Sequence, residues 1–247
     1  MQSHLGSLDW ITSYGLMLML ALVTCWWLAR RNAKKNGIEP SHIDLVLPLA
    51  LLTGFLFVAL RPDPRIQLIP LIITCLLVVF IYSRVARLEF GRLTDAFALP
   101  TIAAIAIQRI GCFLAGCCWG DPVSSDAFQW LGVAFPAGGF AHEEHVALGL
   151  IAPGAAASLP VHATQLYEAA FLLALLAAFP RRVAWWLAPG TLTLLAITGY
   201  ALVRFGIEFL RADHVEFAGP FSIVQLVCVA LVLVAGAMGR MNTNAWR

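Results

Sequence analysis

Charged side chains are scarce in this chain of 247 residues: only 12% are Asp, Glu, Lys or Arg, whereas 60% are apolar. Soluble domains carry about 25% charged residues, and the mean hydropathy of +0.82 also lies far outside that class. The composition therefore excludes a soluble globular protein and predicts a polytopic membrane protein. The small net charge of +2 gives no indication of a nucleic-acid partner.

Seven apolar runs can cross a hydrocarbon core, which needs about 20 helical residues. They cover residues 10–29, 43–60, 66–82, 96–118, 166–179, 192–210 and 221–238. We therefore expect an all-α membrane protein with seven transmembrane helices in a single integral membrane domain, 1–247. Because seven is odd, the two termini are expected on opposite sides of the membrane.

Positive charge is missing from two parts of the chain, before Arg30 and from residue 120 to residue 161. Eleven of the sixteen basic residues fall in four other segments, namely Arg30, Arg31, Lys34 and Lys35, then Arg84, Arg87 and Arg92, then Arg181 and Arg182, and finally Arg240 and Arg247. Since cytoplasmic loops retain Lys and Arg, the N-terminus is predicted to be periplasmic and the C-terminus cytoplasmic. Residues 120–161 then form a periplasmic arm, and the first run is an anchor rather than a cleaved signal.

Three arginines, Arg109, Arg204 and Arg211, fall in or beside apolar runs. An arginine inside a bilayer costs at least ~2.5 kcal/mol, so each is expected to face an interior partner or an aqueous cavity. The segment TGYALVRFGIEFLRAD spaces Tyr200, Arg204, Glu208 and Arg211 by four, four and three residues. At about 100° per residue they share a stripe roughly 80° wide, so one face of the helix is polar.

These charges allow two readings. In the first, Arg109 and Arg204 pair with Glu168 and Glu208 only to hold the helices together. In the second, three arginines facing two or three carboxylates leave a surplus of positive charge, which would bind an anion. Guanidinium groups suit phosphate, and the phosphate at hand in a bilayer is a phospholipid head group.

Three of the six cysteines, Cys112, Cys117 and Cys118, lie close together in the sequence. The spacing disfavours a metal site, because ligand pairs in zinc sites are usually two to four residues apart, and no fourth ligand follows nearby. It also disfavours a disulfide, since positions 112 and 117 would lie about 140° apart on a helix. Packing of small residues is the favoured reading, and a functional thiol stays open. Residues 114–117, LAGC, match a lipobox, but their place in mid-chain makes this coincidental.

Three ordered motifs resemble those of the prolipoprotein diacylglyceryl transferase family. Residues 108–120, QRIGCFLAGCCWG, are similar to the family's G-R-x-G-N-F-x-N-G-E-x-x-G; residues 162–168, HATQLYE, are similar to H-P-S-Q-L-Y-E; and residues 199–211 are similar to G-Y-x-x-x-R-x-x-x-E-x-x-R. Weaker similarities include Tyr14-Gly15-Leu16, residues 132–136, and Ser222 with Gln225.

The resemblance implies a bacterial inner-membrane enzyme that moves the diacylglyceryl group of phosphatidylglycerol to the lipobox cysteine of a prolipoprotein. Arg109, Arg204 and Tyr200 would be catalytic, with the arginines stabilising the departing phosphate. The residues implied in substrate binding are Tyr14, Cys112, Gly120, His162, Gln165, Tyr167, Glu168, Glu208 and Arg211. No cofactor and no metal are implied, and the partners are the phospholipid donor, the prolipoprotein acceptor and the bilayer.

The chain departs from the family's pattern at two places. The His-Gly-Gly near the outer end of the third span, a candidate base for the thiol, is replaced by residues 67–70, QLIP, which hold no histidine. The signature's two asparagines and its glutamate are replaced by Cys112, Ala115 and Cys117. Three explanations stay open: His142, His145 or His162 serves as the base; the chain uses another acceptor, with a cysteine as carrier; or it binds phospholipid without catalysis.

Overall fold

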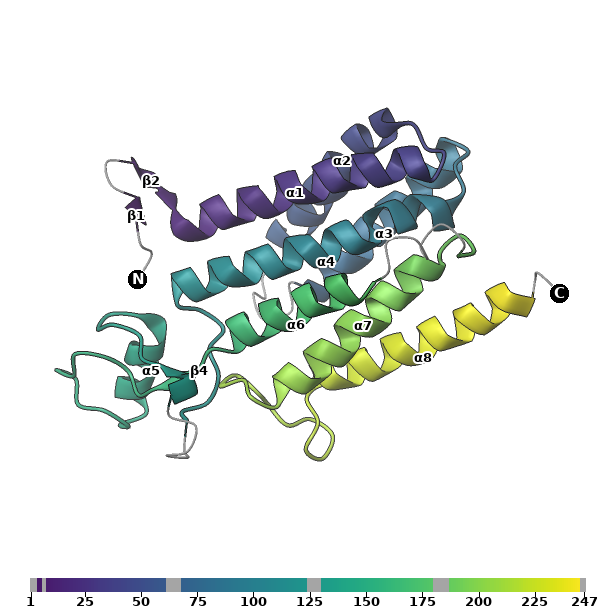
Figure 1. The fold of residues 1–247 in the computed structure, drawn as a ribbon. Helices are drawn as coiled ribbons and strands as arrows, with labels where there is room; N and C mark the ends of the chain where they lie inside the picture. Colours follow the sequence, from purple (N-terminus) through teal and green to yellow (C-terminus); the bar gives the residue numbers. More distant parts are fainter. Residues whose placement is uncertain (1–3, 6–7, 61–67, 124–129, 180–186, 245–247) are drawn as a thin grey trace. The chain divides into compact units, whose positions relative to one another are not determined.

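The computed structural model describes residues 4–5, 8–60, 68–123, 130–179 and 187–244 of the chain. The described part is mainly helical (Figure 1), with helices α1 Ser13–Lys35, α2 Pro40–Ala59, α3 Leu68–Val85, α4 Phe90–Ala115, α5 Phe140–Ala147, α6 Thr164–Ala178, α7 Thr191–Glu208 and α8 Ile223–Asn244. Four short strands, β1 His4–Leu5, β2 Leu8–Thr12, β3 Gly132–Val133 and β4 Val161–His162, form two antiparallel pairs, β1 with β2 and β3 with β4.

Five helices are long and apolar enough to cross a membrane, over Ser13–Lys35, Pro40–Phe57, Phe90–Ala115, Thr191–Glu208 and Ile223–Arg240. Two shorter apolar helical segments, Ile73–Val85 and Thr164–Ala178, coincide with the third and fifth predicted spans. Large apolar side chains such as Met19, Leu52 and Leu202 are exposed on these helices, as expected for surfaces that face lipid. The chain is therefore a helical multi-pass membrane protein.

The fourth predicted span needs a correction, because α4 ends at Ala115 rather than at residue 118. Gly116 has φ of +68° and Cys118 has φ of +63°. These left-handed conformations cannot continue a right-handed helix, and glycine adopts them at little cost. The first helix differs in the other direction, since α1 continues through the basic cluster to Lys35.

Contacts divide the chain into two compact units. The first comprises residues 1–22, 102–179 and 197–237, and the second comprises residues 23–101, 180–196 and 238–247. The core of the second unit contains Ala29, Ala33, Ile38, Ile43, Leu93 and Ala96. There the buried Asp95 accepts hydrogen bonds from the amides of Gly190 and Thr193, at 2.7 and 2.8 Å, and so caps the beginning of α7.

The first unit contains the predicted periplasmic arm. Its small apolar cluster consists of Phe135, Ala141 and Val161, against which Phe113 and Trp119 pack. Two buried histidines of α5 bind the returning backbone: His142 Nε2 lies 2.8 Å from the carbonyl of Ala155, and His145 Nδ1 accepts a 3.1 Å hydrogen bond from the amide of Leu159. The arm is thus an ordered element that packs onto the end of α4.

Candidate active site

The chain that leaves α4 is fixed by hydrogen bonds from the first turn of α6. Thr164 Oγ1 donates to the carbonyl of Cys118 at 2.8 Å, and Gln165 Nε2 donates to the carbonyl of Cys117. Both donor side chains are almost fully buried. The HATQLYE motif therefore orients the end of the QRIGCFLAGCCWG motif.

Gly120 continues this fixed segment and joins it to the end of α7. Its amide donates to the carbonyl of His162 at 2.9 Å, and the next amide, of Asp121, donates to the carbonyl of Leu210 at 3.0 Å. A Cβ on Gly120 would lie 2.2 Å from the Leu210 oxygen. Glycine is therefore required here because two backbones approach too closely for any side chain. We call residues 116–121 the α4–α6 clamp segment.

Two ion pairs lie in the interior of the first unit. Arg109 Nε of α4 is 2.9 Å from Glu168 Oε2 of α6, and Arg204 Nη2 of α7 is 2.7 Å from Glu208 Oε2 one turn later. The half-buried Tyr200 interacts electrostatically with Glu168 and with both guanidinium groups. Three helices thus bring Arg109 and Arg204 to one tyrosine, which confirms that the buried arginines have interior partners.

The third arginine lies just beyond α7 and is held by an acidic neighbour. Arg211 donates to both carboxylate oxygens of Asp213, from Nε and Nη2, each at 2.7 Å. Burial disfavours the charged guanidinium, but the hydrogen bonds and charge of Asp213 outweigh it, so the pKa of Arg211 lies above its usual value. Glu208, 4.0 Å from Arg211 Nε, also accepts a 2.8 Å hydrogen bond from Ser222 Oγ.

The expected surplus of positive charge is not found among these residues. Three arginines face three carboxylates, those of Glu168, Glu208 and Asp213. The prediction failed because it did not assign Asp213, whose side chain is 68% exposed, to the cluster. An anion entering here must therefore compete with carboxylates for the guanidinium groups.

Several buried polar atoms of the cluster have no hydrogen-bond partner within the described residues. They are Arg109 Nε, Trp119 Nε1, Gln165 Oε1, Glu168 Oε1, Arg204 Nη1, Glu208 Oε2 and His214 Nδ1. Arg109 Nε and Glu208 Oε2 belong to ion pairs whose geometry is not that of a hydrogen bond. Leaving a buried polar group unsatisfied costs about 1–3 kcal/mol, so Arg204 Nη1 in particular is a donor available to a ligand.

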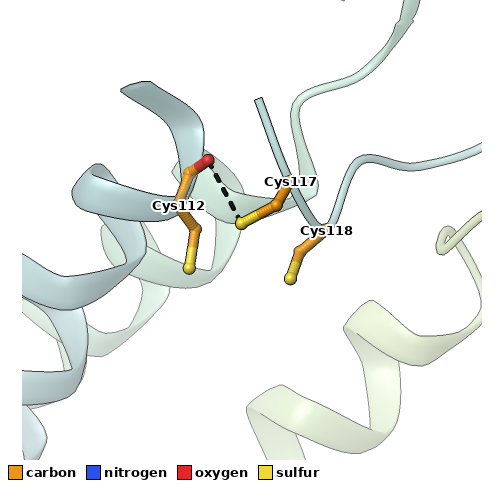
Figure 2. Close-up of side chains that lie close together, drawn as sticks. All are labelled: Cys112, Cys117 and Cys118. Atoms are coloured by element: carbon orange, nitrogen blue, oxygen red, sulfur yellow. Dashed lines mark hydrogen bonds between the residues drawn. The ribbon is translucent and has the colours of Figure 1, made fainter. Parts of the chain in front are cut away.

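The three neighbouring cysteines converge (Figure 2). Their sulfur atoms all lie within 4.8 Å of one another, and Cys117 Sγ also contacts the carbonyl of Cys112 at 3.6 Å. The expectation that residues 112 and 117 lie about 140° apart on one helix is wrong, because the left-handed turn at Gly116 ends the helix and folds the next two cysteines back. All three are free thiols.

The other predicted residues lie in two places. Tyr14 accepts a 3.2 Å hydrogen bond from Gln108 Nε2, which also donates to Cys112 Sγ at 3.0 Å, so Tyr14 is linked to the thiols. Tyr167 instead donates to the carbonyl of Leu131 in the arm at 3.2 Å, and His162 Nδ1 lies 3.4 Å from its hydroxyl.

Sequence reasoning missed the partners that position this cluster. They are Gln108, Thr164 and Asp213, which lie within or beside the quoted motifs. Ser222 and Gln225, noted only as weak similarities, hold Glu208 and the start of α8. The motif positions were the available signal, since a polar residue in an apolar motif needs a partner.

The helices and the buried arginine–carboxylate cluster define an integral membrane protein with a polar interior site. Residues 71–240 match the sequence profile of prolipoprotein diacylglyceryl transferase. The chain belongs to the prolipoprotein diacylglyceryl transferase family, which confirms the resemblance seen in its motifs.

Curated relatives named phosphatidylglycerol-prolipoprotein diacylglyceryl transferase align over most of the chain. The protein of Nitratidesulfovibrio vulgaris is 26% identical, over 88% of this chain and 84% of its own length. That of Dehalococcoides mccartyi is 29% identical, over 90% and 85%. That of Klebsiella pneumoniae is 28% identical, over 92% and 86%. The similarity therefore extends over nearly the whole length of both chains in each comparison.

Proposed function

We propose that this protein transfers the diacylglyceryl group of phosphatidylglycerol to the lipobox cysteine thiol of prolipoproteins in the bacterial inner membrane. Family membership and the names of the full-length relatives support this activity. The structural observation that carries the proposal is the approach of Arg109 and Arg204, from two helices, to the half-buried Tyr200.

The reaction breaks the bond between the glyceryl carbon and a phosphate oxygen and forms a carbon–sulfur bond. The electron pair of the broken bond leaves on glycerol phosphate, and the thiol proton is released. Charge on the leaving phosphate is greatest as the bond breaks, so guanidinium donors in a water-poor interior stabilise the transition state. Arg204 Nη1, buried without a described partner, is the donor that such a phosphate would engage first.

The other site residues have supporting roles in this proposal. Glu168 and Glu208 orient Arg109 and Arg204 until the lipid phosphate replaces part of each pairing. Tyr200, which interacts electrostatically with both arginines, would donate a hydrogen bond to the lipid phosphate. Gln165 holds the clamp segment, and Gly120 allows the close approach of its backbone to α7.

The topology proposed with this function is a single integral domain, 1–247, with seven spans. The N-terminus and the arm at about 120–161 would be periplasmic, and the C-terminus cytoplasmic. The distribution of Lys and Arg supports this orientation. The buried hydrogen bonds of His142 and His145 favour a structural role for these two histidines over that of a base.

The test is complementation of a strain depleted of its diacylglyceryl transferase, with mass analysis of a reporter lipoprotein. We expect a diacylglyceryl thioether on the reporter with the unaltered chain and with the control Arg92→Lys, whose side chain is half exposed. Arg109→Lys and Arg204→Lys should insert normally but reduce transfer by at least about tenfold, because lysine lacks the guanidinium fork. Lipid turnover without reporter modification, or bound lipid without turnover, would refute the proposed acceptor or the proposed catalysis, respectively.

A further inference from the structure

The three converging thiols form a site to which the lipid transfer described so far assigns no role as a whole, although the family resemblance implies substrate binding for Cys112. Cys112 is contributed by α4, and Cys117 and Cys118 by the clamp segment that follows it (Figure 2). Cys118 holds a left-handed conformation although it is not glycine, which costs about 1–2 kcal/mol. The surrounding hydrogen bonds from Thr164 and Gln165 maintain this arrangement.

The spacing of the sulfur atoms fits a small thiophilic cation. Zinc binds cysteine sulfur at about 2.3 Å, which places tetrahedral ligands about 3.8 Å apart. The three sulfurs already lie within 4.8 Å of one another. Side-chain rotations that move the sulfurs by about 1 Å or less would therefore place them at the separations of three zinc ligands. A metal site with three protein ligands and one open position is the arrangement of catalytic zinc, whereas structural sites have four protein ligands.

The surroundings of the thiols supply nearby cations and a hydrogen-bond donor. Arg211 and Arg109 both interact electrostatically with Cys118. Three thiolates and one zinc ion would carry a net charge of −1, and Arg109 and Arg211, although paired with Glu168 and Asp213, lie near enough to reduce its cost. Gln108 Nε2, which donates to Cys112 Sγ at 3.0 Å, supplies the kind of outer hydrogen bond that orients a metal ligand.

We propose that Cys112, Cys117 and Cys118 bind one zinc ion, and that the open fourth position takes the cysteine thiol of the acceptor and activates it for lipid transfer. The second half of this statement rests on the proposed function. It also accounts for the absence of the family's His-Gly-Gly from residues 67–70, because a metal-bound thiol is deprotonated without a neighbouring base.

The step balances without any redox partner. Coordination to zinc releases the proton of the acceptor thiol to water. A sulfur electron pair then forms the bond to the glyceryl carbon, the carbon–oxygen bond breaks, and its electrons leave on glycerol phosphate. The product is a thioether, a weaker zinc ligand than a thiolate, so it can dissociate, and the zinc ion stays in the +2 state throughout.

The first experiment measures the metal directly. The full-length protein in lipid nanodiscs should contain about one zinc per chain by elemental mass spectrometry. Replacement by Co²⁺ should give intense sulfur-to-cobalt charge-transfer bands. Cys112→Ser, Cys117→Ser and Cys118→Ser should each lose the bands, whereas the control Cys75→Ser, in the second compact unit, should keep them. Unaltered protein that binds neither ion, or bands that survive all three substitutions, would overturn the site.

The second experiment separates the zinc proposal from the proposed function. A lipobox peptide with cysteine should strengthen the Co²⁺–sulfur bands of the unaltered protein, and a peptide with serine should not. Removing zinc with a strong chelator should slow transfer by about thirtyfold near pH 7, since only a few per cent of a free thiol is then ionised, and zinc should restore the rate. Full transfer by the zinc-free protein overturns the zinc role but supports the proposed function. A retained cobalt spectrum with no response to the peptide and no transfer supports the metal site and overturns the proposed function.

Discussion

Glu168→Gln is the most informative single substitution, because it removes one charge from a buried pair while keeping the shape of the side chain. Glu168 is 1% exposed and its partner Arg109 is 12% exposed. Removing one partner of a buried ion pair typically costs 3–5 kcal/mol, since the other charge stays buried and uncompensated. The glutamine oxygen can still accept a hydrogen bond. We therefore expect the free energy of unfolding to fall by about 3 kcal/mol, the lower end of this range.

The matched control is Glu89→Gln, which makes the same chemical change in a pair whose side chains are 54% and 53% exposed. Solvent screens that pair, so its loss should cost at most about 1 kcal/mol. Both variants would be followed by tryptophan fluorescence during heating in the same detergent. At about 2–4 °C per kcal/mol for a chain of this size, Glu168→Gln should lower the midpoint by about 6–12 °C and the control by under about 4 °C.

The Glu168→Gln variant also tests whether the cluster recognises phosphate. Without its carboxylate partner, Arg109 should be stabilised more by an anionic lipid. Added phosphatidylglycerol should therefore raise the midpoint temperature of unfolding more in this variant than in the control. Equal midpoint shifts for the two variants would show that Arg109 does not depend on Glu168. Equal responses to the lipid would show that its guanidinium does not contact the head group.

Three further predictions concern backbone approach, capping and pH. Gly120→Ala should destabilise by about 1–3 kcal/mol or more, because its Cβ would lie 2.2 Å from a backbone oxygen, whereas Gly206→Ala, with nothing within 4 Å, should be neutral or stabilising in the same heating assay. Asp95→Ala removes the cap of α7 and should lower stability by about 1–2 kcal/mol; an unchanged midpoint would contradict this. Burial lowers the pKa of His145, so its contribution to arm stability is present above about pH 6.5 and is lost as the pH falls toward the folded pKa. Limited proteolysis of the arm should therefore be faster at pH 5 than at pH 7.5.

The sequence was sufficient to locate most of the long helices and the carboxylate partners of Arg109 and Arg204, Glu168 and Glu208. Apolar runs and bilayer thickness together locate spans, and a guanidinium in an apolar run must find a carboxylate or water. The four-residue spacing of Tyr200, Arg204 and Glu208 placed them on one face, and the structure brings all three to the same cluster. Such inferences succeed because they depend on the geometry of a single helix.

The thiol cluster could not be predicted, because it depends on where a helix stops. Reading residues 112–118 as continuous helix separates Cys112 from Cys117, whereas a left-handed turn at Gly116 brings them together. The charge balance was missed for a similar reason. Asp213 lies beyond α7, in a turn whose course depends on the neighbouring clamp segment. Loop geometry is fixed by tertiary contacts rather than by periodicity, so one-dimensional patterns do not reveal it.

The convergence of three sulfurs on one point has a consequence for natural variation. In the proposed zinc site, loss of one cysteine would abolish metal binding by the other two. Selection should therefore retain or discard Cys112, Cys117 and Cys118 as a set. Gly120, in contrast, is required because any side chain there would clash with the carbonyl of Leu210. It should therefore be retained whether or not the cysteines are. Family members that have the His-Gly-Gly motif at the positions of residues 67–70 are expected to do without these three thiols.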